Sequence, residues 1–235
     1  MGEMDGARPT YFLLSDYLTI SDRLPDPVKL ANLLANLHRS SVSPTGQFGF
    51  YISTFDGRMP QVTTWDPSWQ SFFSKLLAGA LDMYLQNNGS WKELEEMVQR
   101  TRTHVIPRLL GALEADGRTI KPSLIHGDLW EGNIGTDIAT GNIYIFDPCC
   151  YYAHHEMELA IWRTEHHEMK SKVYRREYFR LMPPSEPLEE WDDRNRLYCV
   201  KTKLMYSSHF DSPHVRQQYD HTSSLFFPQR LQRLT

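Results

Sequence analysis

Apolar residues recur at steps of three and four along much of the chain, which is the spacing of helices that bury one face. The first such stretch predicts a helix that begins at Pro27, a residue favoured in the first helical turn, and ends near His38. Its apolar stripe consists of Val28, Leu30, Leu33, Leu34 and Leu37. A second helix is predicted over residues 66–86.

The third predicted helix covers residues 90–115, with Ser90 as its N-cap and Glu93 at the capping-box position. Helical spacing returns over residues 154–176 and over residues 189–208. A proline-rich stretch separates these last two helices. The chain is therefore predicted to be mainly helical.

Strands are predicted where the apolar runs are short. Residues 11–14 indicate a buried strand near the start of the chain, and residues 134–135 and 143–146 indicate a hairpin joined by a turn-rich link. Residues 40–65 are rich in Gly, Ser and Pro and follow neither period, so we expect a long loop that forms a wall of the substrate site. Helices around a central hairpin indicate an α+β fold.

The composition is that of a globular protein with one sizeable core. The 25 Lys and Arg residues against 29 Asp and Glu residues leave a net charge of -4, which gives no basic surplus for nucleic acid or an anionic membrane. The polar, acidic first residues do not resemble a secretion signal, and no run approaches the ~20 apolar residues of a membrane span. The three cysteines fit no zinc pattern. We therefore expect a cytoplasmic protein with reduced thiols.

The candidate chemistry lies in residues 126–133, His-Gly-Asp-Leu-Trp-Glu-Gly-Asn, and in the hairpin that follows. Asp128 and Asn133 stand five apart, as in the kinase catalytic loop, where the Asp accepts the proton of the acceptor hydroxyl and the Asn holds Mg²⁺. Asp147 ends the second strand of the hairpin, where a second metal-binding carboxylate is needed. Because Mg²⁺ prefers carboxylate and amide oxygens, this spacing predicts a phosphoryl-transfer site.

Turn chemistry offers another explanation for each of these residues taken alone. Asp128 could cap a turn, Asn133 could adopt a left-handed turn conformation, and Asp147 could merely end a strand. Their combination at kinase spacing favours phosphoryl transfer. His126, the remaining candidate catalytic residue, is expected to orient the loop through backbone hydrogen bonds rather than to transfer a proton.

Several segments together resemble the fructosamine-3-kinase (ketosamine-3-kinase) family, whose fold is related to aminoglycoside phosphotransferases and protein kinases. They are residues 126–130 with Gly132 and Asn133, residues 146–148, residues 152–160, residues 48–50, Pro60, Gln61, Trp65, Trp69, Phe72 and Phe73. The resemblance covers residues 11–210. Its most specific element is Trp130, directly after the Asp-Leu pair.

The resemblance implies a role for each residue of the motif, with ATP and Mg²⁺ as cofactors. Asp128 would deprotonate the O3 hydroxyl of the sugar, and Asn133 and Asp147 would bind Mg²⁺. Trp130 would pack against the ketosamine, although a tryptophan of the core is an equally simple explanation.

The hinge that meets the adenine is also assigned by the resemblance, to Asp16, Tyr17 and Leu18. Kinases of this fold carry before that hinge an N-terminal lobe with a Gly-rich loop and a lysine for the phosphates. We therefore expect residues 1–20 to be a remnant of that lobe with the hinge, and most of the lobe to be missing. Residues 21–235 are then a protein-kinase-like C-terminal lobe with the substrate and Mg²⁺ sites, which alone should bind ATP poorly.

The first functional hypothesis is ATP-dependent phosphorylation of the sugar O3 of ketosamines, a deglycation repair activity. Its partner would be a ketosamine-modified protein or a small-molecule ketosamine, such as a fructosamine or ribulosamine. One alternative is another small-molecule kinase of the aminoglycoside or choline kinase type. The other is a non-catalytic, pseudokinase-like binding module, which Mg²⁺-dependent ATP affinity would distinguish from an enzyme. The oligomeric state is left open.

A second group of side chains invites a metal hypothesis, because His155 and His166 fall on one helical face. The group comprises His154, His155, Glu158, His166, His167 and Glu168. Its spacing matches no zinc signature, so a structural role is favoured.

Overall fold

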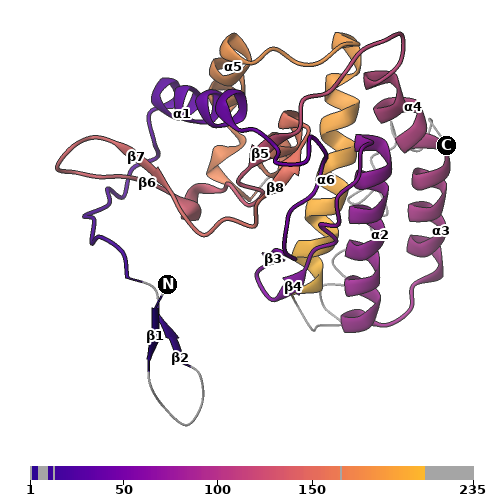
Figure 1. The fold of residues 1–235 in the computed structure, drawn as a ribbon, viewed down its shortest axis with the longest axis horizontal. Coiled ribbons are helices and arrows are strands. Elements are labelled where there is room, and N and C mark those ends of the chain that lie inside the picture. Colours follow the sequence, from indigo (N-terminus) through magenta and orange to yellow (C-terminus); the bar gives the residue numbers. More distant parts are fainter. Residues whose placement is uncertain (1, 5–9, 13, 165, 210–235) are drawn as a thin grey trace.

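Helices make up most of the fold. The computed structural model describes residues 2–4, 10–12, 14–164 and 166–209. The α-helices are α1 (Pro27–Ser40), α2 (Trp69–Asn88), α3 (Lys92–Arg100), α4 (Ile106–Leu110), α5 (Lys172–Leu181) and α6 (Trp191–Ser208). In Figure 1, α2 lies beside α6 and α3, while α1 and α5 form a second group at the top of the view.

The strands form short antiparallel pairs. The pairs are β1 (Gly2–Met4) with β2 (Thr10–Phe12), β3 (Phe55–Asp56) with β4 (Met59–Pro60), β5 (Ser123–Ile125) with β8 (Tyr151–Ala153), and β6 (Ile134–Thr136) with β7 (Ile143–Ile145). The expected central hairpin is confirmed as β6–β7. Helices combined with small antiparallel sheets confirm the mixed, mainly helical part of the predicted fold class.

Helix α1 forms as its sequence predicts. The Asp26 side chain accepts hydrogen bonds from the N–H groups of Val28 and Lys29 at 3.0 and 2.9 Å, so it caps the helix ahead of Pro27. Leu30 and Leu34 of the apolar stripe are fully buried, whereas Val28 is exposed. The buried face packs against α5.

The third predicted helix is one helical run with changes of pitch. It passes from α3 through a π-turn, η1 (Thr101–Val105), into α4 and a short 3₁₀ turn, η2 (Gly111–Leu113). Pro107 lacks the N–H that would close the preceding turn, and the wider π-turn lies there. The predicted cap was wrong: Trp91 is the N-cap, and Glu95 rather than Glu93 reaches back to its N–H at 3.1 Å.

The prediction of a single helix over residues 154–176 was wrong. The chain forms 3₁₀ turns, η4 (His155–Arg163) and η5 (Glu168–Lys170), and α5 begins only at Lys172. Residues 155–162 are all buried, so this segment is enclosed on every side and has no solvent face. Because no face of the segment meets solvent, the spacing of its apolar residues could not predict its conformation.

The predicted strand at residues 11–14 was only partly correct. Strand β2 forms a hairpin with β1, which lies away from the helices in Figure 1. Phe12 and Leu14 are 45% and 85% exposed, so the expectation of a buried strand was wrong; Leu13 lies outside the described residues. Aromatic content favours a strand but does not determine what the strand packs against.

The long loop expected over residues 40–65 is present and contains the small β3–β4 hairpin. Two isolated bridges fix this loop: Phe48 pairs with Asp66, just before α2, and Gly49 pairs with Tyr152, the central residue of β8. The loop is thereby held against the β5–β8 pair. None of the described helices combines the length and apolar character needed to cross a membrane.

Two hydrophobic clusters hold the fold together. The first gathers side chains of α2, α4 and α6 around Trp69, and the second gathers α1, α5 and η4. Ile125 belongs to the first cluster, while Leu129 and Ile134 belong to the second. The candidate catalytic segment therefore runs from one cluster to the other and is anchored at both ends.

The cap of α1 gives a direct test of this account. Asp26→Ala removes the acceptor for two N–H groups of the first turn, so we expect the free energy of unfolding to fall by about 1 kcal/mol in urea denaturation. Asp22→Ala is the matched control, because Asp22 is exposed and lies in the coil before the helix. Equal stabilities of the two variants would contradict the capping role.

Candidate active site

The segment after β5 is shaped by Gly127 and His126. Gly127 has a φ of 85°, and a Cβ there would lie 2.8 Å from the Cys149 carbonyl oxygen, so only glycine fits. His126 Nε2 donates to the Phe146 carbonyl at 2.9 Å, and His126 Nδ1 accepts from the Asp128 N–H at 3.3 Å. This pattern requires a neutral ring with its proton on Nε2. The ring joins the catalytic loop to the end of the β6–β7 hairpin.

Glu158 holds the same loop from below. Its Oε2 accepts the His126 N–H at 2.6 Å and its Oε1 accepts the Gly127 N–H at 2.9 Å. His38 Nε2 donates to Oε2 at 3.3 Å from α1. Burial works to raise the pKa of Glu158, but the hydrogen bond and charge of His38 hold it below the usual value of 4.5. A buried carboxylate thus fixes two successive backbone groups of the loop.

Asn133 closes the loop on Asp128. Its Nδ2 donates to the Asp128 carbonyl at 2.8 Å and to Asp128 Oδ2 at 3.0 Å. Its own carbonyl accepts the Phe146 N–H at 3.1 Å. Asn133 does not have a positive φ, so the alternative of a left-handed turn is wrong for this residue. Among the described residues, no hydrogen bond reaches Asn133 Oδ1, which leaves one amide oxygen available.

Asp147 follows Phe146, the residue that bonds to both His126 and Asn133. Its φ of 58° is left-handed, a conformation uncommon outside glycine and concentrated at functional sites. Its side chain is exposed, and within the described part of the chain no hydrogen bond reaches the carboxylate. The structure therefore brings His126, Asp128, Asn133 and Asp147 together on one loop-hairpin unit.

The charge on Asp128 is tuned by its surroundings. Partial burial raises its pKa, the nearby carboxylate of Asp56 raises it further, and the hydrogen bond from Asn133 and the charge of Lys201 oppose the increase. Lys201 is buried; its Nζ donates to Gln61 Oε1 at 2.6 Å and lies 3.4 Å from Asp56 Oδ2. Although burial works to lower the pKa of Lys201, neighbouring groups including Tyr151 and Asp56 raise it. Lys201 thus stays cationic beside the two aspartates.

A cavity of about 1180 Å³ opens next to Asp128. Gly127, Asp128 and Trp130 line it from the catalytic loop, and Asp56 and Gly57 line it from the β3–β4 hairpin. This volume slightly exceeds the usual range for small-molecule sites, about 300–1,000 Å³. Asp128 can therefore be reached from the cavity.

Trp130 stands at the edge of this cavity. It is 36% exposed, so the alternative of a core tryptophan is wrong. Its ring lies against His167, with centroids 5.6 Å apart, and it covers Gly132 so closely that a Cβ there would overlap the indole. The indole thus contacts His167 and Gly132 and also lines the cavity.

The predicted hinge residues lie outside the cavity. Tyr17 is 93% exposed, and Asp16 and Leu18 belong to the same stretch without regular structure. The following residues run beside the hairpin, where the Ser21 N–H donates to the Thr136 carbonyl at 2.8 Å. None of the three hinge candidates lines the cavity. Their contact with adenine stays a prediction.

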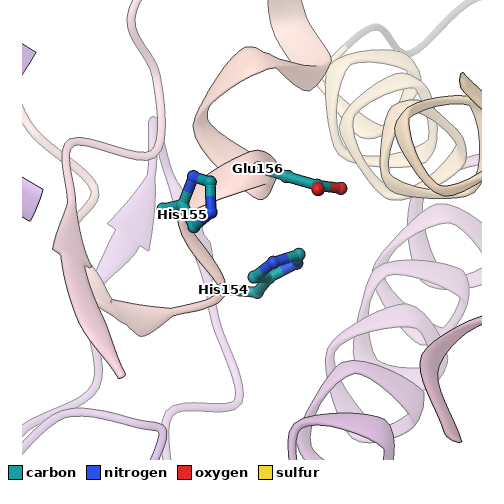
Figure 2. A group of neighbouring side chains, drawn as sticks. All are labelled: His154, His155 and Glu156. Atoms are coloured by element: carbon teal, nitrogen blue, oxygen red, sulfur yellow. The ribbon is translucent and has the colours of Figure 1, made fainter. Parts of the chain in front are cut away.

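Three neighbouring side chains at the start of the histidine-rich segment lie close enough to bind a metal, but they have structural partners instead. Figure 2 shows His154, His155 and Glu156, whose potential ligand atoms lie within 4.8 Å of one another. Both oxygens of Glu156 accept from buried Arg194 at 2.8 Å. Both ring nitrogens of His154 bond to hydroxyls, those of Tyr198 and Ser185, at 2.9 Å. Burial lowers the pKa of both histidines well below 6.5, which supports neutral, structural rings.

The comparison with known proteins identifies the family. A sequence model described as fructosamine kinase matches residues 2–225. The chain belongs to the fructosamine kinase family. The predicted resemblance is thereby confirmed.

Individual members of the fructosamine kinase family show how far the similarity extends. The chain is 32% identical over 196 residues to the chloroplastic protein-ribulosamine 3-kinase of Oryza sativa subsp. japonica, covering 82% of this chain and 54% of the relative. It is 40% identical over 167 residues to the ketosamine-3-kinase of Mus musculus, covering 71% and 50%. The chain therefore spans about half the length of the curated relatives it matches.

A solved structure supports the fold. The crystal structure of a proposed fructosamine-3-kinase from Haemophilus somnus 129PT superposes with a TM-score of 0.66 at 21% identity, covering 87% of this chain and 65% of that one. The matches cover most of the chain, and the prediction that most of an N-terminal lobe is missing is not confirmed. The division at residue 20 stays a prediction.

Sequence reasoning missed several residues that shape this site. Glu158 was recognised only as part of the resembled pattern, without its role under the loop. Asp56 and Lys201 are 145 residues apart in sequence and carry no motif, so no local signal pairs them. They are found only once the β3–β4 hairpin is placed against α6.

Glu158→Gln tests the support of the loop. In glutamine one of the two carboxylate oxygens is replaced by an NH₂ group, which cannot accept a backbone N–H. We therefore expect the free energy of unfolding at pH 7 to fall by about 3 kcal/mol. Because the folded-state pKa is lowered, the stabilisation is present above pH 4.5 and is lost as the pH falls through the folded-state value. The stability difference from the unmodified protein should therefore shrink in acid.

Urea denaturation at several pH values measures this difference. Glu189→Gln serves as the control, since Glu189 is exposed. A constant difference between Glu158→Gln and the unmodified protein from pH 7 to pH 3 would count against the charged role of Glu158.

Proposed function

We propose that the protein is an ATP-dependent kinase that phosphorylates the O3 hydroxyl of ketosamines. The observation that carries this proposal is the joining of His126, Asp128, Asn133 and Asp147 on one loop-hairpin unit, next to a cavity large enough for an acceptor. Membership of the fructosamine kinase family supports the substrate class.

Asp128 acts as the general base in this proposal. Its carboxylate lines the cavity, where a sugar hydroxyl can approach within hydrogen-bond reach. Asn133 holds one of its oxygens through a 3.0 Å bond, which fixes the orientation of the carboxylate. His126 fixes the backbone of Asp128 and takes no part in proton transfer, because its Nδ1 accepts the Asp128 N–H and its proton lies on Nε2.

Asn133 and Asp147 fit a magnesium ion, since an amide oxygen and a carboxylate that have no other partner among the described residues are suitable ligands for this cation. When bound, Mg²⁺ neutralises charge on the phosphates of ATP. The chain's own contribution is to hold both donors at the junction of the loop and the hairpin. We further propose that Asp16, Tyr17 and Leu18 meet the adenine, on the side of the hairpin away from the acceptor.

Trp130 positions the sugar in this proposal. An indole face offers an apolar surface to the C–H groups of a sugar ring, and this indole is fixed against His167 at the cavity edge. The relatives named as protein-ribulosamine and ketosamine kinases support ketosamines, free or attached to protein, as acceptors. We further propose deglycation as the outcome of the reaction. We also propose that the reaction takes place in the cytoplasm.

The substitution Asp128→Asn tests the function. We expect the rate of phosphate transfer from ATP to fructosamine and ribulosamine acceptors to fall at least about a hundredfold, because the amide cannot accept the hydroxyl proton. Turnover is measured with Mg²⁺ in the full gene product. Asp116→Asn is the matched control, since Asp116 is an exposed aspartate outside the cavity.

Two outcomes would contradict the proposal. Turnover by Asp128→Asn at the control rate would remove Asp128 from the mechanism. Folded, unmodified protein that transfers no phosphate to either acceptor would favour a non-catalytic binding module, and absent ATP binding would strengthen that conclusion.

A further inference from the structure

One face of α6 forms a wall of the cavity. Asp192, Arg196, Cys199, Val200 and Lys203 all line it. Their spacing of three and four residues places them along a single helical face. The cavity therefore extends along several turns of α6, beyond the place where a sugar would meet Asp128.

Arginine side chains gather at this wall around a single carboxylate. Arg163 Nη1 donates to Asp192 Oδ1 at 2.8 Å, and Arg196 Nε donates to Asp192 Oδ2 at 3.0 Å. Arg175 lies over the Trp191 ring, with its guanidinium carbon 5.3 Å from the ring centroid. All three arginines line the cavity. Asp192 thus pairs with two guanidinium groups, and a third lies over the ring of the preceding residue.

The electrostatics of the cluster reflect this imbalance. Burial lowers the pKa of Arg175, and the nearby positive charge of Arg163 lowers it further. Burial works to raise the pKa of Asp192, yet the hydrogen bond and charge of Arg163 and the charge of Arg196 hold it below its usual value. The cluster retains positive charge that Asp192 alone does not neutralise.

The same imbalance holds for the whole cavity. Six Lys and Arg residues line it against four Asp and Glu residues, whereas the chain carries a net charge of -4. Lys170 and Lys172 add to the excess beside the start of α5. A positive cavity in an acidic protein attracts and retains anions.

We propose that Arg163, Arg175 and Arg196 bind an anionic group, a carboxylate or a phosphate, carried by the acceptor ketosamine. This inference rests on the proposed function and specifies its substrate class. Arginine presents a planar fork of N–H donors that matches the oxygens of both groups. Because the cavity exceeds the volume that a sugar alone fills, one molecule reaches from Asp128 to the arginine cluster.

The phosphates of ATP are not the anion concerned. The metal-binding candidates Asn133 and Asp147 do not line the cavity, and neither do the proposed adenine contacts. The nucleotide therefore approaches Asp128 from the hairpin side, while the cluster lies on the acceptor side.

The test compares an acceptor without an anionic group with two acceptors that each carry one. The acceptors are 1-deoxy-1-propylamino-fructose, its 6-phosphate, and the fructosyl adduct of 6-aminohexanoate, which carries a carboxylate. For each acceptor, kcat/KM is divided by kcat/KM for the propylamino acceptor in the same variant. We expect Arg175→Gln to lower this ratio by about tenfold for each anionic acceptor, mainly because KM rises. Arg175→Lys should recover part of the loss.

Arg176→Gln is the matched control. Arg176 is the next residue on α5, is exposed, pairs with Glu177 at 3.1 Å, and does not line the cavity. A loss confined to the carboxylate acceptor assigns the site to a carboxylate, and a loss confined to the phosphate acceptor assigns it to a phosphate. Equal ratios in Arg175→Gln and Arg176→Gln for both anionic acceptors would overturn the inference.

A binding measurement separates this inference from the proposed function. Should the unmodified gene product phosphorylate none of the acceptors, the proposed function fails. Calorimetric titration with inorganic phosphate then decides the anion site by itself. Weaker binding by Arg175→Gln than by Arg176→Gln supports the site, and equal binding refutes it.

Discussion

The buried carboxylate of Glu158 is the interaction on which the candidate site depends. It accepts the successive N–H groups of His126 and Gly127 and is itself bonded to His38 of α1. The catalytic segment is thereby fixed at the boundary between the two hydrophobic clusters. A neutral acceptor would be a weaker partner for two buried backbone donors. The charge under the loop therefore orders the backbone from which Asp128 extends.

Further hydrogen bonds join the loop that Glu158 holds to the end of the β6–β7 hairpin. His126 bonds to the Phe146 carbonyl, and Asn133 bonds to both the Phe146 N–H and the Asp128 side chain. The left-handed Asp147 comes next in the chain. The donors of the proposed metal site and the proposed base are thus coupled through backbone groups of one residue. Small displacements of the hairpin would be transmitted directly to Asp128.

The sequence predicted those features that local chemistry determines. Helix α1 follows from Pro27 at its start and an apolar stripe, and the β6–β7 hairpin follows from short apolar runs. The spacing of Asp128 and Asn133 indicated that they belong to one loop of kinase type. It could not predict that Glu158 lies under the loop, or that Asp56 and Lys201 flank Asp128, because these contacts join segments far apart in the chain. The 3₁₀ conformation of η4 could not be predicted either, because every residue from 155 to 162 is buried and the segment has no face toward solvent.

In the proposed reaction, this loop-hairpin unit directs phosphate to the O3 hydroxyl of a ketosamine held beside Trp130. Correlated ³¹P and ¹H NMR of the reaction product locates the phosphate. We expect coupling of phosphorus to the proton on C3 of the sugar. Phosphate on another hydroxyl, or on the carrier, would contradict the proposed placement of the acceptor.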